Sequence, residues 1–391
     1  MSGTEPTRQF SLTSAQLAIR DSAFTFAQER IAPHSIRWDQ EKHFPVDVIR
    51  SGAALGMGGI CVARDAGGSN LSRLDAVLIY DSLAQACPCI AGYFSVHNMV
   101  ALIVDQFGNQ QQRDEWLPRL CNFNLLGAYC LSEPAAGSDA SAISTRAERD
   151  GADYLLHGTK RFISGAGAAD LYVVIARTAS TGPRGLSAFL VEKGTAGLSF
   201  GPPEKKMGWN AQPTCEVIFE DVRIPAANLL GTEGNGFKIA MSALHGGRLN
   251  IAACSLGGAR SALEKARAYL HEREAFGRKL SEFQALRFRL ADMATELEVA
   301  QTFLWRAASA LDANESNATV LCAMAKRFVT DAGFNIANEA LQLFGGYGYL
   351  ADYGIEKIVR DLRVHQILEG TNEIMRGIIA RSLLGGSSFA G

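Results

Sequence analysis

The chain has 391 residues, of which 47% are hydrophobic and 20% charged, and its formal net charge is −2 at pH 7. This length exceeds the size at which a single hydrophobic core usually stops growing, so we expect two or three domains. The near-neutral charge excludes the basic surface that is typical of proteins that bind nucleic acid or anionic membranes.

The first helix is predicted by a capping box in which Thr13 lies three residues before Gln16. Leu17, Phe24 and Ile31 follow at seven-residue steps. We therefore expect these three side chains to form one apolar face of that helix.

Helical patterns continue to about residue 125, with further helices predicted around residues 74–87 and 97–107. The pattern then changes to short runs rich in Val, Ile and Phe, separated by Gly, Pro and Asn, which predicts strands. Residues 153–164 read as two short strands around a His-Gly turn. We expect an N-terminal helical domain over residues 1–125 and a middle β-barrel or sandwich domain over residues 126–230.

The chain becomes helical again over residues 231–391. A second capping box is predicted where Ser281 precedes Gln284. Four apolar residues then recur at helical spacing: Leu286, Leu290, Met293 and Leu297. With the long apolar run over residues 319–344, these patterns predict a C-terminal helical bundle.

The segment Tyr129–Ala142 is rich in small and hydroxylated residues. Gly137 would let backbone amides approach a flat or anionic ligand, and the hydroxyls of Ser132 and Ser138 can donate or accept hydrogen bonds. A surface turn at the start of the β domain explains the same composition. Composition alone leaves both interpretations open.

Two glycine-rich segments raise a similar question. The sequence after Ser164 reads GAGA but lacks the strand–GxGxxG–helix context of a dinucleotide-binding loop, so we reject that interpretation. Farther along, Gln342 ends a helix and Gly345 and Gly346 follow. These glycines indicate either a helix C-cap or an opening where a ligand meets the backbone.

Near the C-terminus, Glu369 lies between the apolar residues Ile367 and Leu368 on one side and Gly370 on the other. A buried carboxylate is unfavourable unless it is compensated. Glu369 is therefore either a loop acid that faces water or a carboxylate kept dry so that it can take a proton. Thr371 is predicted to cap a short helix, whose free amides would lie beside this acid.

Together these segments resemble the acyl-CoA dehydrogenase family of flavoproteins, over essentially the whole chain. One pattern, apolar-[Ser/Thr]-Glu-x-x-small-Gly-[Ser/Thr]-Asp, is met by residues 131–139. The other, Gln-x-x-Gly-Gly-x-Gly-aromatic with spaced Asp, Lys and Asp, is met by residues 342–361. Residues 205–214 and 246–259 are most similar to the short-branched-chain members.

The resemblance implies an N-terminal helical domain, a middle β domain and a C-terminal four-helix bundle, assembled as a homotetramer with FAD. Residues 129–138 and 162–164 would line the FAD, residues 273–284 and 342–346 would reach the FAD of a neighbouring subunit, and residues 371–373 would close over the cofactor. The individual residues implied for the cofactor are Tyr129, Leu131, Ser132, Gly137, Ser138, Phe162, Ile163, Ser164, Arg273, Phe276, Phe283, Gln284, Gln342, Leu343, Gly345, Gly346, Thr371, Asn372 and Glu373.

Two of these positions depart from the family pattern. Many relatives carry Trp in place of Phe162, and a phenylalanine there keeps the stacking surface. Many carry His in place of Phe283, and the missing imidazole puts that contact in doubt. Gln284 also has a second interpretation, because it completes the predicted capping box.

The resemblance assigns the catalytic base to Glu369. Some relatives place the base on an earlier helix, but the matching residue here is Gly247, which cannot serve. The residues implied for the acyl-CoA are Ser138, His245, Arg248, Gly370 and Arg381. Arg248 could equally pair with a carboxylate of the protein itself instead of a ligand phosphate. Arg381 could simply be a surface residue that faces water.

The implied reaction converts a short, branched acyl-CoA to its 2-enoyl-CoA. Glu369 would take the α proton, FAD would accept the β hydrogen as hydride, and the electrons would pass to an electron-transfer flavoprotein. No metal is expected. Two alternatives keep the fold, namely an oxidase that uses oxygen and a C–S lyase that acts on a sulfur-bearing acyl-CoA. A third is a flavin-holding scaffold without activity.

The sequence also bears on location. The eight cysteines lack the spacing of zinc or redox motifs and fit buried thiols in a reducing compartment. No stretch approaches the ~20 apolar residues of a membrane span, and residues 1–12 lack a signal pattern. We expect a cytoplasmic protein, or a mitochondrial matrix protein if a leader has been removed, with neither nucleic acid nor membrane as a partner.

Overall fold

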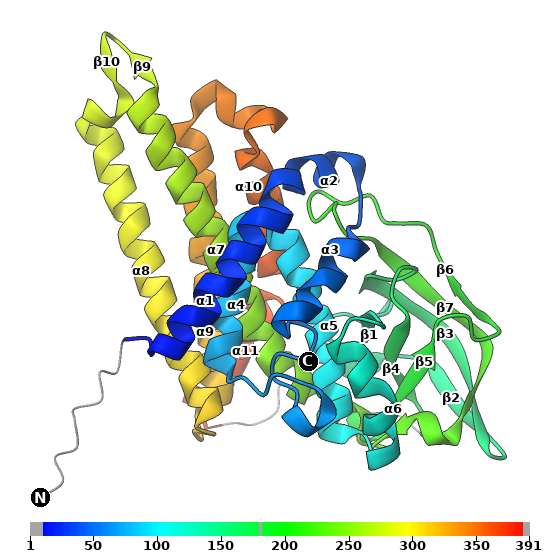
Figure 1. The fold of residues 1–391 in the computed structure, drawn as a ribbon. Coiled ribbons are helices and arrows are strands. Elements are labelled where there is room, and N and C mark those ends of the chain that lie inside the picture. The colour runs from blue at the N-terminus through cyan, green and yellow to red at the C-terminus, as the bar shows by residue number, and fades with distance from the viewer. Residues whose placement is uncertain (1–10, 180–181, 386–391) are drawn as a thin grey trace, which may run out of the picture.

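The computed structural model describes residues 11–179 and 182–385. Helices come first, strands follow and helices close the chain, which confirms the predicted multidomain α+β fold. Figure 1 shows the strands gathered on one side of the molecule and the long helices on the other. The domain boundaries at residues 125 and 230 stay predictions.

The predicted capping box of α1 is confirmed, because Thr13 Oγ1 accepts a hydrogen bond from the Gln16 N–H at 3.2 Å. The predicted apolar face is wrong, since Leu17 and Phe24 are exposed and only Ile31 is buried. A π-helical turn that ends at Ile31 follows the α-helix. A π-helical turn contains more residues than an α-helical turn, so residues seven positions apart no longer lie on the same face of the helix.

The described part of this N-terminal region has six α-helices: α1 (Ser14–Phe26), α2 (Ser35–Glu41), α3 (Val46–Ser51), α4 (Arg73–Ala86), α5 (Pro88–Phe107) and α6 (Gln110–Cys121). Contrary to the expectation of no membrane-length stretch, α5 is long and apolar enough to cross a membrane. However, 94% of its most apolar window is buried inside the protein, as in a core helix of a globular protein.

The middle strands of the described chain form one sheet in the order β6-β7-β3-β2-β4-β5-β8, and β1 pairs with β4. Their bounds are β1 (Gly127–Cys130), β2 (Arg146–Asp150), β3 (Asp153–Ser164), β4 (Leu171–Arg177), β5 (Leu186–Glu192), β6 (Leu198–Phe200), β7 (Thr214–Pro225) and β8 (Leu229–Leu230). The predicted His-Gly turn is wrong, because β3 is continuous. Gly158 lies instead at a register shift against β7, where a bulge absorbs the extra residue.

The described C-terminal helices are α7 (Gly236–Glu272), α8 (Gln284–Asp312), α9 (Ala318–Leu343), α10 (Ile355–Arg363) and α11 (Asn372–Leu383). A small hairpin, β9 (Glu274–Ala275) and β10 (Arg278–Lys279), joins α7 to α8. The capping box predicted from Ser281 and Gln284 is wrong. A 3-10 turn precedes α8, and within it Glu282 accepts a hydrogen bond from the Lys279 N–H at 3.2 Å.

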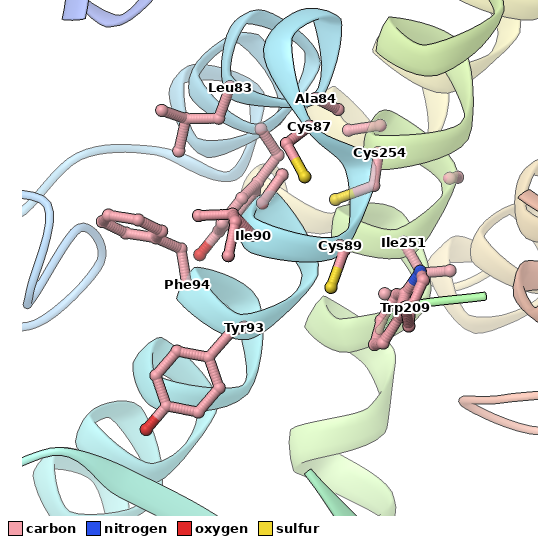
Figure 2. Close-up of a cluster of buried hydrophobic side chains, with 14 of the residues drawn as sticks. Leu83, Ala84, Cys87, Cys89, Ile90, Tyr93, Phe94, Trp209, Ile251 and Cys254 are labelled. Carbon is pink, nitrogen blue, oxygen red and sulfur yellow. The ribbon is translucent and has the colours of Figure 1, made fainter. Parts of the chain in front are cut away.

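One part of the core joins the helices to the β domain where α4 turns into α5. Figure 2 shows Cys87, Cys89 and Cys254 in this cluster beside Trp209, which comes from the loop before β7. The Trp209 ring lies so close to Gly92 that a larger side chain at this position would collide with it. All eight cysteines lie within the described ranges and are free.

Candidate active site

Glu369 lies in the loop between the 3-10 turn Val364–Gln366 and α11. Its φ of 57° is in the left-handed region, which few non-glycine residues adopt, and Gly370 follows at 87°. Thr371 caps α11 as predicted, because its Oγ1 accepts a hydrogen bond from the Ile374 N–H at 3.3 Å. Two successive left-handed residues therefore turn the chain sharply just before the helix.

The segment before Glu369 is fixed by His365. The indole N–H of Trp209 can only donate, so His365 Nε2 accepts at 3.2 Å and its Nδ1 donates to Ser255 Oγ at 2.7 Å. Burial lowers the pKa of His365 to about 3, which agrees with a neutral ring. These contacts tie the loop to α7 and to the middle domain.

The Glu369 carboxylate is enclosed at Oε2, which has no hydrogen-bond partner among the described residues. Burial is the largest influence and raises its pKa, while the charges of Arg248 and Lys326 lower it. The resulting pKa is about 7. A carboxylate with a pKa near neutral pH suits a general base.

Two cations and a phenol surround this carboxylate. Arg248 from α7 is 4% exposed, and its Nε is buried without a partner in the described chain. Tyr129 from β1 also has a buried, unpartnered hydroxyl there, and burial together with the charge of Glu369 raises its pKa. Lys326 from α9 donates to the Gly370 carbonyl at 2.8 Å. Several buried polar atoms without partners indicate a site that a ligand completes.

Gly247 provides the space for the Glu369 carboxylate. A Cβ at residue 247 would lie 2.5 Å from Oε2 and 3.0 Å from Cδ of Glu369. The carboxylate therefore lies directly against α7. Residue 247, which was the alternative position for a base, faces the same space as Glu369.

A buried ion pair holds the loop of residues 131–139. Lys160 Nζ lies 2.8 Å from Glu133 Oε1, and both side chains are buried. Glu133 also accepts hydrogen bonds from the backbone N–H groups of Ser144 at 2.6 Å and Thr145 at 2.9 Å. Burial opposes ionisation, but these partners outweigh it and lower the pKa of Glu133 to about 2. Glu133 therefore acts as a permanent anion that shapes the loop.

Phe162 presents an aromatic ring to the surface. It is 61% exposed, and its φ of 60° is left-handed at an irregular position of β3. Its neighbour Ile163 is buried, and Ser164 Oγ accepts a hydrogen bond from Gln212 Nε2 at 3.3 Å. A flat, exposed ring on a strained backbone is suited to a planar ligand such as a flavin.

Other residues implied for the cofactor lie elsewhere. A surface pocket between the ends of α7 and α9 is lined by Arg273, Gln342, Leu343, Gly345 and Gly346, among others. Arg273 lies 25 residues after Arg248 (273 minus 248), nearly all along α7, or about 38 Å at 1.5 Å per residue. Figure 1 shows the adjoining β9–β10 hairpin far from the middle strands. Within one chain, the residues of this pocket therefore lie far from the residues around Glu369.

Several other predicted residues are either exposed or already bound to other parts of the protein. Phe276, at the β9–β10 hairpin, is 95% exposed, and its ring centroid lies 6.2 Å from that of Phe283. Gln284 at the start of α8 and Arg381 on α11 are exposed. Asn372 is buried, and its side chain is occupied by hydrogen bonds to α9. Asn372 therefore serves the loop itself.

The remaining predicted residues lie in the loop after β1, on α7 and on α11. Leu131, Ser132, Gly137 and Ser138 belong to the loop that Glu133 holds. His245 is half-buried on α7, and burial and the charge of Arg248 lower its pKa. Glu373, in the first turn of α11, is exposed and pairs with Arg376 at 3.0 Å.

Of the three buried lysines in the described chain, sequence reasoning missed two, Lys160 and Lys326. Lys326 left a signal, because it shares one helix face with the buried residues Cys322 and Val329. A lone cation on an apolar face requires a buried acceptor. Lys160 left no comparable signal, since its partner Glu133 is distant in sequence.

Known proteins similar to this chain share its domain order. Three family models match it: the acyl-CoA dehydrogenase N-terminal domain at residues 13–124, the middle domain at 128–222 and the C-terminal domain at 234–384. Mitochondrial isobutyryl-CoA dehydrogenase of Bos taurus is 52% identical over 373 residues, covering 95% of this chain and 90% of that protein.

Two solved structures extend the likeness to the fold. Butyryl-CoA dehydrogenase from Megasphaera elsdenii is 38% identical with a TM-score of 0.93, covering 96% of this chain and 99% of that one. PigA with FAD and proline is 30% identical with a TM-score of 0.93, covering 96% of this chain and 100% of that one.

Proposed function

The chain belongs to the acyl-CoA dehydrogenase family, and on this basis we propose that it desaturates isobutyryl-CoA or an acyl-CoA of similarly short, branched shape. As a member of the family it is an FAD-dependent oxidoreductase that acts on a CH–CH bond of an acyl-CoA. The 52% identity to the isobutyryl-CoA dehydrogenase of Bos taurus supports the proposed substrate.

The Glu369 carboxylate carries the proposal. The α hydrogen of a thioester is too weakly acidic for a carboxylate in water, and a drier carboxylate is a stronger base. Burial raises the pKa of Glu369 to about 7, and its Oε2 lacks a partner in the described chain. In the proposed reaction this carboxylate takes the α proton.

The negative charge that develops on the thioester oxygen needs a hydrogen-bond donor. Among the described residues, no acceptor takes the backbone N–H of Glu369, so this group is available to that oxygen. One such donor contributes about 3–4 kcal/mol to the transition state in other enzymes. The nearby charge of Arg248 also favours an anion.

The residues present fit FAD, which when bound supplies the two-electron acceptor for the hydrogen that leaves the β carbon. Phe162 offers an exposed ring for stacking. A Cβ at Gly137, Gly345 or Gly346 would meet no described atom within 4 Å, so the backbone is open to close approach there. Residues of these three segments would hold the cofactor.

A homotetramer would bring the separated residues together. The pocket around Arg273 and Gly346 lies about 38 Å along α7 from Arg248, so we propose that it completes the FAD site of a neighbouring subunit. We also propose electron-transfer flavoprotein as the electron acceptor. The relative is mitochondrial, which supports a mitochondrial location for this chain.

Turnover of a panel of acyl-CoA thioesters with an artificial electron acceptor tests the substrate. We expect isobutyryl-CoA to have the highest kcat/KM, above straight butyryl-CoA and longer chains. A higher kcat/KM for a long straight chain would contradict the proposal.

A second experiment separates the dehydrogenase from the alternatives that share its fold. We expect isobutyryl-CoA to bleach the flavin absorbance without oxygen, and to yield little peroxide in air. Stoichiometric peroxide would indicate an oxidase, and release of a sulfur acid from a sulfur-bearing acyl-CoA would indicate a lyase.

A further inference from the structure

Lys326 is a buried cation to which the proposed reaction assigns no role. Its side chain, on α9, is 0% exposed. Its Nζ donates to the Gly370 carbonyl at 2.8 Å and to Asn372 Oδ1 at 2.9 Å. The first acceptor lies in the loop, one residue after Glu369, and the second is the first residue of α11, three residues after Glu369. The only way this buried ammonium avoids a large desolvation cost is through such contacts.

Other residues of α9 reinforce the same loop. Asn372 Nδ2 donates to Thr330 Oγ1 at 3.0 Å and to Asp331 Oδ1 at 2.7 Å. Asp331 Oδ1 also accepts a hydrogen bond from Gln366 Nε2 at 2.8 Å. Because Gln366 precedes Glu369 and Asn372 follows it, α9 holds the loop on both sides of the carboxylate.

The left-handed backbone of Glu369 needs such support. A non-glycine residue keeps a φ of 57° only where its surroundings hold it there. The hydrogen bond from Lys326 to the Gly370 carbonyl acts on the peptide directly after this strained residue.

We propose that Lys326 is a positioning residue for the base: its ammonium holds Gly370 and Asn372, and so fixes the turn that places the Glu369 carboxylate against Gly247. The proposal rests on the proposed function, in which Glu369 takes the proton.

The same ammonium acts on the charge of Glu369. The Lys326 charge lowers the pKa of Glu369, and burial lowers the pKa of Lys326 itself to about 8. At pH 7 Lys326 is therefore protonated. The other charged or titratable groups that face this pair are Arg248, Tyr129, Asp331, Glu373 and His365.

Two substitutions separate positioning from charge. Lys326→Met removes the charge and both hydrogen bonds, whereas Lys326→Gln keeps a donor for the Gly370 carbonyl. In both variants we expect the acid limb of the kcat/KM profile to move up by about one pH unit. We expect kcat to fall about 10- to 100-fold in Lys326→Met and less in Lys326→Gln.

Thr330→Val is the matched control. It loses hydrogen bonds to Asn372 but keeps the charge of Lys326, so its pH profile should match that of the wild type. A lysine with a merely structural role would lower FAD content or kcat and leave the pH profile in place. An unmoved profile in both Lys326 variants would overturn the proposal.

A second measurement needs no substrate and keeps the two proposals distinguishable. The quantity to measure is the difference in unfolding free energy between Glu369→Gln and the wild type. This difference grows with pH as the wild-type carboxylate ionises. The pH at which it grows therefore reports the pKa of Glu369. In a Lys326→Gln background this dependence should move to higher pH. A pH dependence that moves supports the action of Lys326 on Glu369, even if the wild-type holoenzyme desaturates no acyl-CoA. In that case the proposed function alone fails. If the pH dependence stays in place, the action of Lys326 is refuted.

Discussion

Glu133, in the loop after β1, and Glu369, in the loop before α11, are carboxylates with opposite surroundings. Glu133 is only 4% exposed, yet Lys160 and two backbone N–H groups keep it ionised. Glu369 is the more exposed residue, but its Oε2 is enclosed and has no partner in the described chain. Their pKa values are about 2 and about 7.

The contrast shows that partners, more than depth, decide what a buried carboxylate does. The lowered pKa of Glu133 adds stability that is present above pH 4.5 and is lost as the pH falls through about 2. The raised pKa of Glu369 has the opposite sign, so its contribution is present below pH 4.5 and is lost as the pH rises through about 7. The satisfied anion maintains structure, and the unsatisfied anion is available for chemistry.

The largest expected effect is that of Glu369→Gln on turnover. The amide keeps the shape of the side chain but cannot take a proton, so we expect kcat to fall at least about 10²- to 10⁴-fold. FAD content and substrate binding should persist, as measured by flavin absorbance and equilibrium titration. Wild-type turnover in this variant would remove Glu369 from the role of base.

The next largest expected effect is a loss of stability when the ion pair between Glu133 and Lys160 is broken. Lys160→Met leaves a buried anion without its cation and should cost about 3–5 kcal/mol in urea unfolding. The double variant Glu133→Gln, Lys160→Met should recover part of this loss, because no uncompensated charge remains. If the single variant is as stable as the wild type, the pair does not hold the loop.

Gly247→Ala should displace the Glu369 carboxylate without unfolding the protein. The new Cβ would lie 2.5 Å from Oε2, and the end of a flexible side chain can move away. A misplaced base costs up to about 10²-fold in rate, so we expect kcat to fall about 10- to 100-fold. Gly377→Ala on α11 is the control, since its Cβ would meet no described atom within 4 Å. Equal activity in both variants would contradict the geometry of this site.

A further effect, which appears only in stability, is a gain from Glu369→Gln. One pKa unit corresponds to about 1.36 kcal/mol, so the rise from 4.5 to about 7 makes the ionised carboxylate cost up to about 3 kcal/mol. Urea unfolding at pH 8 should show most of this gain, and unfolding at pH 5 should show little. A gain that is independent of pH would mean that the carboxylate is not destabilised.

Local and periodic features were predictable from the sequence. The capping of α1 by Thr13 and of α11 by Thr371 depends on residues three positions apart, and both are present. The order of helices and strands followed from hydrophobic spacing. The face of α1 was not predictable, because a π-helical turn shifts Ile31 relative to Leu17 and Phe24.

Contacts between distant segments could not be read from the sequence. Lys160 meets Glu133 only because the fold brings β3 against the loop after β1, and no local pattern encodes that pairing. Taken alone, the pattern around Glu369 favoured a loop acid over a base. The fold supports the proposed base, because it places the carboxylate against Gly247, next to Arg248 and Lys326.

The pH dependence of kcat/KM for isobutyryl-CoA with the wild-type holoenzyme tests the central claim most directly. The active form of Glu369 is the carboxylate, so kcat/KM should fall tenfold per pH unit below a single midpoint near pH 7, where its pKa lies. A profile that stays flat to pH 5, or that falls only near the ordinary value of 4.5, would contradict the claim that a dry, unpartnered Glu369 is the base.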